Sequence, residues 1–283
     1  MTDTNEQQLS AIKKFRTLHE SGCFVMPNPW DAGTSRYLQH LGFEALATTS
    51  AGFAFSRGLP DSASAIERYD MIGHIREIVQ ATSLPVNADF QNGFADDPQG
   101  VADNVNLCIA TGVAGLSIED SSETVAGGLY ESSLAVDRIK AARAAIDASG
   151  VPVVLTARAE VYLVGAADPL SVALDRLVAF ADAGADCLYA PGVTDPEQIR
   201  TIVKAVAPKP VNVLVSRPNN LLSVARLTDL GVRRISVGSG LAMVAWGSFI
   251  RAAQTLKESG SFEDFAGGAS YAELNGLFGP RTP

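Results

Sequence analysis

The sequence has few residues that could serve as thiolate or imidazole catalysts. Its 283 residues include only three cysteines and three histidines. The cysteines have no close spacing, which suggests neither a disulfide framework nor a thiolate zinc site. The histidines all fall within helical patterns, so neither a histidine-based triad nor a histidine-rich metal site is expected. The residues concerned are Cys23, Cys108, Cys187, His19, His40 and His74.

Positive charge and long apolar runs are also scarce. The net charge of −9 argues against a nucleic-acid partner, because phosphate binding requires a basic face. No uninterrupted apolar run reaches the roughly 18 residues that a membrane-spanning helix needs. Residues 1–8 are polar and lack the apolar core of a signal peptide. We therefore expect a cytoplasmic protein with neither a nucleic acid nor a membrane as its partner.

The lysines are absent from the ends of the predicted strands. A lysine that forms a Schiff base would have to reach the active site from such a position, so a Schiff-base aldolase is not expected. The lysines lie instead in helical patterns or loops, at Lys13, Lys14, Lys140, Lys204, Lys209 and Lys257.

What the sequence does contain is a repeated alternation of short apolar strands with helical patterns. The predicted strands span 23–27, 44–49, 85–89, 113–119, 152–158, 186–190, 211–215 and 233–238. The intervening helices are predicted at 31–41, 64–81, 97–111, 134–149, 169–183, 195–206 and 219–230. Strands that are apolar on both faces and joined through helices indicate a parallel sheet. Eight such units favour a (β/α)₈ TIM barrel.

An open doubly wound sheet is the alternative to the barrel. Such a sheet more often has a glycine-rich loop after its first strand. Val-Met-Pro-Asn-Pro at 25–29 occupies that position instead. We therefore predict one barrel domain over 1–283.

The ends of the chain do not fit the repeat. An extra helix is predicted at 5–20, and two more at 240–257 and 263–277, so that 240–283 forms a C-terminal helical extension. The segment 241–246 is apolar most of the way round, and such a helix must be buried. Two places are open: under its own barrel, or against a partner subunit.

Acidic and amide side chains gather where the predicted strands end. Asn87 and Asp89 share one face of a strand, Glu119 ends the next, and Asp61 follows the second strand at a distance. Oxygen ligands without thiolate or imidazole suit Mg²⁺ better than zinc, and Mn²⁺ is a second option. The neighbouring Asp120 is interpreted as a capping acid.

Two further segments at strand ends could bind a substrate. Arg158 can clamp a carboxylate, or else form a salt bridge to Glu160 or Glu119 that only shapes the mouth. The turn at Ser50, Ala51 and Gly52 offers backbone N–H groups and a hydroxyl, which suit a carboxylate or an oxyanion, although a plain turn has the same pattern.

These residues together resemble the isocitrate lyase / phosphoenolpyruvate mutase superfamily, from about Leu18 to about Trp246. The motifs that carry the resemblance are GLPDS (58–62), NAD (87–89), IED (118–120), TARAE (156–160) and AGAD (183–186). The resemblance implies a barrel that binds Mg²⁺ and a 2-oxo acid or its enolate. It also implies a homo-oligomer, a dimer or tetramer, in which a C-terminal helix such as 240–257 is exchanged between subunits.

The resemblance also assigns roles to single residues. Asp89 and Glu119 belong to the metal shell, with Asn87 and Asp61 nearby. Arg158 holds the substrate carboxylate. Ser50, Ala51 and Gly52 bind the carboxylate and the oxyanion, and Asn212 is a further expected substrate-binding residue.

Two departures from the family pattern bear on the reaction. Asn87 stands where the family usually has a metal-binding aspartate, so Mg²⁺ should bind more weakly. Lyases of the family carry a cysteine-containing segment after the position of Glu119, whereas residues 121–130 contain neither cysteine nor histidine. Isocitrate and 2-methylisocitrate cleavage are therefore disfavoured. Phosphoryl transfer is disfavoured too, because 190–192 lacks the histidine of the mutase branch.

Three functions stay open. The first is a carbon–carbon lyase or decarboxylase that acts on an oxaloacetate-like or 2-alkylmalate-like substrate, with Asp61 and Arg158 in the catalytic site and Glu123 or Tyr130 protonating the enolate. The second is cleavage or rearrangement of the C–P bond of phosphonopyruvate. The third is a non-catalytic protein that binds a 2-oxo acid or dicarboxylate.

Overall fold

The computed structural model describes residues 2–62 and 64–279. Eight parallel strands form one sheet in the order β1-β8-β7-β6-β5-β4-β3-β2. The strands are β1 (Phe24–Met26), β2 (Leu46–Ala47), β3 (Val86–Asp89), β4 (Gly115–Glu119), β5 (Val154–Arg158), β6 (Cys187–Tyr189), β7 (Val211–Leu214) and β8 (Arg234–Ser236). The backbone N–H of Ala47 donates to Pro27 O at 3.1 Å and links the two ends of the sheet. The nearly closed sheet confirms the predicted (β/α)₈ TIM barrel.

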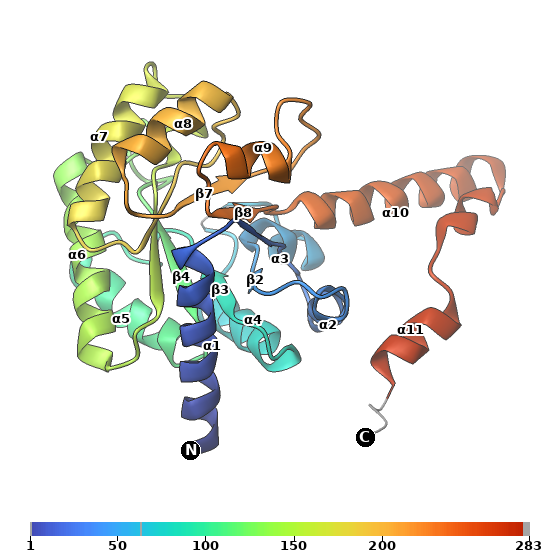
Figure 1. The fold of residues 1–283 in the computed structure, drawn as a ribbon. Helices are drawn as coiled ribbons and strands as arrows, with labels where there is room; N and C mark the ends of the chain where they lie inside the picture. The colour runs from blue at the N-terminus through green and yellow to red at the C-terminus, as the bar shows by residue number, and fades with distance from the viewer. Residues whose placement is uncertain (1, 63, 280–283) are drawn as a thin grey trace.

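Helices alternate with the strands and pack around the sheet (Figure 1). They are α2 (Ala32–His40), α3 (Ser50–Ser56), α4 (Arg68–Ala81), α5 (Pro98–Ile109), α6 (Ser132–Ser149), α7 (Pro169–Asp182), α8 (Pro196–Ala205) and α9 (Val224–Asp229). Helices α5, α7 and α8 each begin with a proline that follows an aspartate cap; at α8, Asp195 accepts from Glu197 N at 2.7 Å. A short 3₁₀ helix, η1 (Glu160–Tyr162), follows β5.

Strand alternation separates the core from the site. Leu116 and Ile118 of β4 are buried in the main apolar core, whereas Ser117 and Glu119 line a pocket in the barrel. Successive side chains of a strand point to opposite faces, so the apolar core residues fix which residues face the barrel interior.

The N-terminal helix α1 (Thr2–Glu20) packs against the barrel. Phe15 is fully buried, and Gln8 Nε2 donates to the carbonyl oxygens of Ile109 and Val113 at 2.9 and 3.0 Å. Arg16 forms an ion pair with Asp186, which follows α7. These contacts tie the helix to segments more than 90 residues away in the sequence.

The C-terminal segments depart from the prediction. The single helix expected at 263–277 is two elements, η2 (Glu263–Gly267) and α11 (Tyr271–Phe278). Consecutive glycines at 267–268 end η2, and Ser270 with Glu273 forms a capping box that starts α11.

Helix α10 (Gly240–Ser259) does not pack under its own barrel, one of the two places expected for it. It extends away from the sheet (Figure 1), and Ala242 is its only buried residue among those described. Val244 and Phe249 are 68% and 62% exposed. The chain then returns so that α11 contacts α2. Within residues 2–62 and 64–279, no helix is long and apolar enough to cross a membrane.

Candidate active site

A cavity of about 470 Å³ lies in the barrel, where the carboxyl ends of the strands meet. This is the face on which TIM barrels carry their active sites. The cavity brings together all of the predicted site residues except Gly52 and Tyr130. Those that line it are Ser50, Ala51, Asp61, Asn87, Asp89, Glu119, Glu123, Arg158 and Asn212.

Arg158 is the centre of the site. Its Nη1 lies 2.8 Å from Asp89 Oδ1 and 2.7 Å from Glu119 Oε1. Its Nε donates to Glu160 Oε1 at 2.8 Å, and its guanidinium carbon lies 5.0 Å from the centre of the Tyr189 ring. Both of the salt bridges considered for Arg158 are therefore present, and the arginine lies in the pocket as well.

One guanidinium shared among three carboxylates leaves an excess of negative charge. The pKa of Glu119 is raised to about 8, mainly by burial; Arg158 lowers it, and the negative charges of Glu160, Asp89 and Asp120 raise it. Burial opposes the charge on Arg158, but Glu119, Glu160 and Asp89 raise its pKa well above the ordinary value. A cation bound in the cavity would offset the excess negative charge of these three carboxylates.

Asp89 is held by the chain that follows β2. Its Oδ2 accepts from Ser50 N at 2.9 Å, and its own N–H donates to Thr48 Oγ1 at 2.8 Å. These two hydrogen bonds fix the Asp89 carboxylate against the segment that directly follows β2, the neighbouring strand.

The expected Ser-Ala-Gly turn is the first turn of α3. Thr49 caps this helix, and its Oγ1 accepts from Gly52 N at 3.1 Å. Gly52 is buried against Trp30, where an added Cβ would lie 3.2 Å from Trp30 Cβ. Gly52 is therefore a packing residue, and the structure does not bring its amide to the cavity.

Two amide side chains in the cavity wall have unused buried oxygens. Asn87 is 3% exposed, and its Oδ1 has no hydrogen-bond partner within the described part of the chain. The same is true of Oε1 of Gln91, which is 6% exposed. Sequence reasoning missed Gln91, although it continues the every-second-residue spacing of Asn87 and Asp89.

The donor set fits a hard divalent cation. It consists only of oxygens, from two carboxylates and the unused amide of Asn87. Among the described residues no three His, Cys, Asp or Glu side chains are arranged to hold a metal by themselves. Mg²⁺ commonly binds through one or two carboxylates, with water and substrate as its other ligands, so Asp89 and Glu119 would suffice.

Asp61 and Glu123 lie at the mouth of the same cavity. Burial raises the pKa of Asp61, and the negative charges of Asp89 and Glu123 add to the effect, against the opposing influence of Arg158. Glu123 Oε2 accepts from Ser64 Oγ at 3.2 Å and so connects the loop after β4 with the segment after α3.

Asn212 is held by other side chains of the barrel. Its Oδ1 accepts from Arg234 Nε at 2.9 Å, and its Nδ2 donates to Ser236 Oγ at 2.9 Å. Arg234 is 1% exposed and also donates to Thr156 Oγ1 at 3.0 Å.

Tyr130 does not reach the cavity. It is 2% exposed, its hydroxyl donates to Asp96 Oδ1 at 2.5 Å, and Arg138 stacks over its ring at 4.1 Å. The expectation that Tyr130 protonates a substrate is not supported, because its hydroxyl is bound outside the site.

Asp120 has the structural role expected for it. Its carboxylate accepts from Glu160 N at 2.8 Å and from Arg176 Nη1 at 2.9 Å. Arg176 Nη2 donates to Tyr130 O at 2.7 Å, and Tyr130 N donates to Asp120 O at 2.9 Å. We call Asp120, Arg176 and Tyr130 the loop clamp, since they join the two ends of the 121–129 loop.

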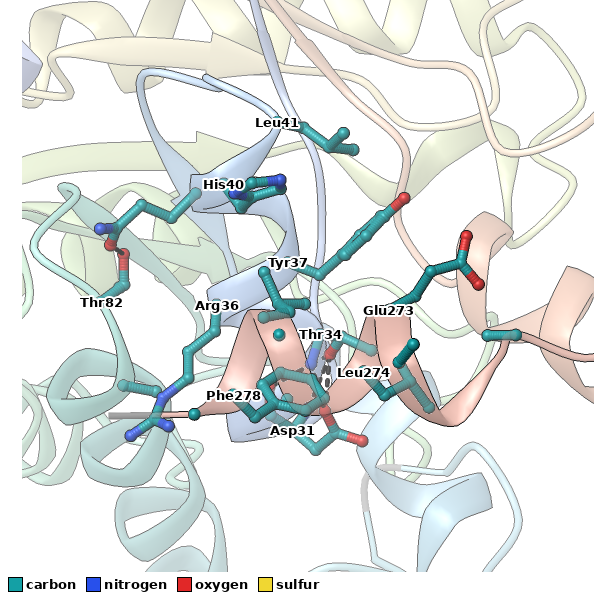
Figure 2. Close-up of a pocket in the computed structure, with 18 of the residues that line it drawn as sticks. Asp31, Thr34, Arg36, Tyr37, His40, Leu41, Thr82, Glu273, Leu274 and Phe278 are labelled. Atoms are coloured by element: carbon teal, nitrogen blue, oxygen red, sulfur yellow. Dashed lines mark hydrogen bonds between the residues drawn. The ribbon is translucent and has the colours of Figure 1, made fainter. Parts of the chain in front are cut away.

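A larger hollow lies away from the strand ends, between α2, the end of α4 and α11 (Figure 2). Its wall includes Tyr37, His40 and Leu274, which come from helix surfaces. Of the described residues that line it, only Asp31 and Glu273 are carboxylates, so the candidate site is assigned to the barrel.

Comparisons with known proteins agree with this site. Residues 15–257 match the family model for phosphoenolpyruvate phosphomutase. A crystal structure of a candidate lyase/mutase from Burkholderia cenocepacia J2315 superposes with a TM-score of 0.93 at 45% identity, covering 98% of each chain. Oxaloacetate acetylhydrolase in complex with oxalate superposes with a TM-score of 0.83 at 27% identity, covering 95% of this chain and 94% of that one.

The chain is also similar in sequence to a lyase of this superfamily. The 2-methylisocitrate lyase of Escherichia coli (strain K12) is 33% identical over 177 residues, which are 59% of this chain and 57% of that protein. The family match over most of the barrel confirms the resemblance carried by the strand-end motifs. The chain belongs to the phosphoenolpyruvate phosphomutase family, within the isocitrate lyase / phosphoenolpyruvate mutase superfamily.

Proposed function

We propose that the protein is a Mg²⁺-dependent enzyme that acts on a small 2-oxo acid through an enolate, as a carbon–carbon lyase or decarboxylase. The observation that carries the proposal is the placement of Asp89, Glu119 and Arg158 around one end of the cavity. The similarity to oxaloacetate acetylhydrolase and 2-methylisocitrate lyase supports a substrate of the oxaloacetate or 2-alkylmalate class. A 2-alkylmalate carries a hydroxyl in place of the oxo group, so its cleavage would remove the hydroxyl proton and release the 2-oxo acid as a product.

Asp89 and Glu119 would hold the metal, with the Asn87 oxygen close by. Bound Mg²⁺ would withdraw electrons from the 2-oxo acid and so stabilise negative charge that develops when the neighbouring bond breaks. Mn²⁺ has similar ligand preferences and is expected to substitute.

The protein side chains would orient the substrate. Arg158 would hold its carboxylate, a role for which a guanidinium has the matching geometry. Ser50 and Ala51 line the wall next to Asp89 and would face a substrate oxygen. Asn212, which is held by Arg234 and Ser236, would form a rigid part of the cavity wall against the substrate.

Glu123 is the proposed proton donor. It lies on the loop after β4, lines the cavity and is connected to Ser64 of the opposite loop. Decarboxylation requires only that the enolate be protonated, so it would not depend on a loop cysteine. The described cysteines would not replace one, because none of the three, Cys23, Cys108 and Cys187, lines the cavity.

Cleavage of a C–P bond is the second candidate, favoured by the family match to phosphoenolpyruvate phosphomutase. Arg217 lines the cavity mouth and would supply a positive charge for a phosphonate.

A substrate panel distinguishes these candidates. Purified protein with Mg²⁺ is assayed on oxaloacetate, 2-alkylmalates and phosphonopyruvate, and turnover of either of the first two is expected to disappear with EDTA. Asp89→Asn should abolish this turnover, whereas Asp103→Asn, on the exposed face of α5, should not.

Phosphate release from phosphonopyruvate alone would favour C–P cleavage. Oxalate binding without any turnover would indicate a non-catalytic binding protein.

We also propose that the arm formed by α10 and α11 is exchanged between subunits of a dimer or tetramer. The exposed apolar residues of α10, including Val244 and Phe249, support this. Light scattering is expected to give a mass of two or four chains, and Phe249→Glu together with Val244→Glu should lower it. A wild-type protein that is monomeric at micromolar concentration would contradict the exchange.

A further inference from the structure

Arg234 is a buried cation without a carboxylate partner. It is 1% exposed and lines the barrel cavity. Its Nε donates to Asn212 Oδ1 at 2.9 Å, its Nη2 donates to Thr156 Oγ1 at 3.0 Å, and its Nη1 lies 3.3 Å from His19 Nε2. All three partners are neutral, and no acid of the described chain forms an ion pair with it, whereas Arg158 contacts three carboxylates. Burial of a charge without a counter-ion costs stability, so this arginine calls for a reason.

The positive charge stays on Arg234. A guanidinium only donates hydrogen bonds, so His19 Nε2 must accept, and His19 Nδ1 carries the hydrogen that is donated to Phe15 O at 2.7 Å. Burial, and after it the charge of Arg234, lowers the pKa of His19 to about 3, so the ring is neutral. The contacts around Arg234 therefore leave one net positive charge inside the barrel.

The same one-way donation fixes the orientation of Asn212. The amide atom that faces Arg234 must be the oxygen, so the NH₂ end faces Ser236, whose Oγ accepts at 2.9 Å. Ser236 lies two residues beyond Arg234 on the same face of β8, since Ile235 between them is buried in the main core. The donor end of Asn212 is thus directed toward the carboxyl ends of the strands, where the cavity lies.

Donor hydrogens are left over at this end of the cavity. Asn212 uses one of its two amide hydrogens on Ser236. The Ser236 hydroxyl, which accepts that bond, is also hydrogen-bonded to the hydroxyl of Tyr189. Whichever of these two hydroxyls gives its hydrogen to the other, one hydrogen remains, and both residues line the cavity. Free donors beside a positive charge suit an anion.

These donors lie across the barrel from the acidic wall. Strands β7 and β8, which carry Asn212 and Arg234, are separated from β3 and β4 by two strands on either side. Asp89 and Glu119, on β3 and β4, present carboxylate oxygens that suit a cation. We call the opposite end the donor wall: Asn212, Ser236 and Tyr189, with Arg234 beneath them.

We propose that Arg234 is a positioning residue that makes the donor wall bind a second carboxylate of the substrate through Asn212. Its charge attracts the carboxylate, and its hydrogen bond turns the Asn212 NH₂ toward the cavity. The inference rests on the proposed function in one respect, since it takes the 2-oxo acid end to lie at Asp89, Glu119 and Arg158. A substrate with a carboxylate at each end would then span the cavity from one wall to the other.

Three substitutions separate charge from orientation. Asn212→Asp gives Arg234 a counter-ion and removes the N–H donors, so in EDTA it should melt at or above the wild-type temperature and still lose the second carboxylate. Arg234→Gln keeps a donor toward Asn212 and removes the charge, whereas Arg234→Lys keeps the charge. Arg233→Gln is the matched control, because the neighbouring Arg233 donates to Gly22 O and does not line the cavity.

The readout is ligand affinity, measured by calorimetry on the Mg²⁺-loaded protein. The ligands 2-oxoglutarate and 2-oxoglutaramate differ only in a far-end carboxylate or neutral amide, and oxalate occupies the 2-oxo acid end alone. The wild type should prefer 2-oxoglutarate by roughly tenfold or more, the scale of a hydrogen bond to a charged group. This preference should vanish in Asn212→Asp and Arg234→Gln, persist in part in Arg234→Lys and persist fully in Arg233→Gln. Oxalate affinity should stay within about twofold throughout.

A preference that survives both Asn212→Asp and Arg234→Gln would overturn the role of the donor wall, as would equal wild-type affinity for the two ligands. A lower melting temperature of Asn212→Asp would also overturn it, because Arg234 would then already have a counter-ion. Glutarate, which lacks the oxo group, should bind to the EDTA-treated wild type and not to Asn212→Asp. Failure of oxalate to bind to the Mg²⁺-loaded wild type, while glutarate still binds, would overturn the proposed function alone.

Discussion

At the scale of single residues, the site is defined by an imbalance of charge. Within residues 2–62 and 64–279, Arg158 is the one cationic side chain in contact with Asp89, Glu119 and Glu160, and the pKa of Glu119 rises to about 8. Glu119 therefore carries a proton near neutral pH when no metal is bound. Metal ligands must be deprotonated, so binding must displace that proton.

The first prediction concerns the pH dependence of metal binding. Between about pH 6 and pH 8, Mg²⁺ affinity should rise by up to roughly tenfold per unit, because Glu119 loses its proton on binding, and should level off above its pKa. Calorimetry in buffers of different ionisation enthalpy should detect the released proton. Glu119→Gln should bind Mg²⁺ more weakly and without this dependence. A flat profile in the wild type would show that Glu119 is not a ligand.

The second prediction concerns Asn87. Asn87→Asp adds a charge where the amide oxygen has no partner, so Mg²⁺ should bind roughly tenfold more tightly. The metal-free variant should lose about 2 kcal/mol of unfolding free energy, since a fourth carboxylate is then buried beside the other three. Urea unfolding with EDTA and with Mg²⁺ measures both effects. Unchanged Mg²⁺ affinity would place the metal away from Asn87.

At the scale of secondary-structure elements, close packing of β4 positions Asn87. A Cβ added at Gly115 would lie 2.8 Å from Asn87 Oδ1, 2.8 Å from Phe15 Cε1 and 3.0 Å from Val154 O. These neighbours belong to α1, β3 and β5, which meet at Gly115. Because they leave no room for a Cβ, only glycine fits at this position.

The third prediction tests this packing. Gly115→Ala should destabilise the protein by about 1–3 kcal/mol, because neighbours on three elements must shift. Gly73→Ala is the control, since a Cβ at Gly73 in α4 would meet nothing within 4 Å and alanine favours the helix by about 0.5–1 kcal/mol. Thermal unfolding of both variants is the measurement. A neutral Gly115→Ala would mean that the barrel wall is more adaptable than the contacts indicate.

Much of this architecture could be predicted from the sequence, because it depends on local patterns. Every strand lies within its predicted range, and the acids at strand ends meet because the carboxyl ends of parallel strands share one face. Tyr130 could not be placed, because Asp96, Asn92 and Arg138 hold it through contacts that span 8 to 38 residues. The short helix α3 was missed because seven residues show too little periodicity.

At the scale of the whole molecule, buried histidines couple stability to pH. Burial lowers the pKa of His74 to about 4 and that of His19 to about 3, with Arg234 contributing at His19. His74 stacks on Phe53 at 3.9 Å and its Nε2 has no partner among the residues described. Both rings are neutral in the folded protein, whereas they bind protons after unfolding below about pH 6.5.

The fourth prediction follows from this difference. The stabilisation is complete above pH 6.5, the ordinary pKa, and decreases as the pH falls towards 4, because the unfolded chain binds more protons. His74 alone should account for about 3 kcal/mol over that interval. Urea unfolding from pH 7.5 to 4 measures the loss. His74→Phe, which keeps a stacked ring, should show a shallower decline, and an equal slope in both proteins would contradict the assignment.

The loop clamp has a consequence for the diversification of this protein. Asp120, Arg176 and Tyr130 fasten both ends of residues 121–129 to the barrel, and Asp120 also fixes the backbone of Glu160, the partner of Arg158. We therefore expect that residues 121–129 can be replaced by another loop sequence without disturbing the barrel. Substitutions, insertions or a transplanted loop would alter the reaction at the mouth while the metal-binding wall keeps its geometry, so new activities could evolve in this barrel without a loss of folding.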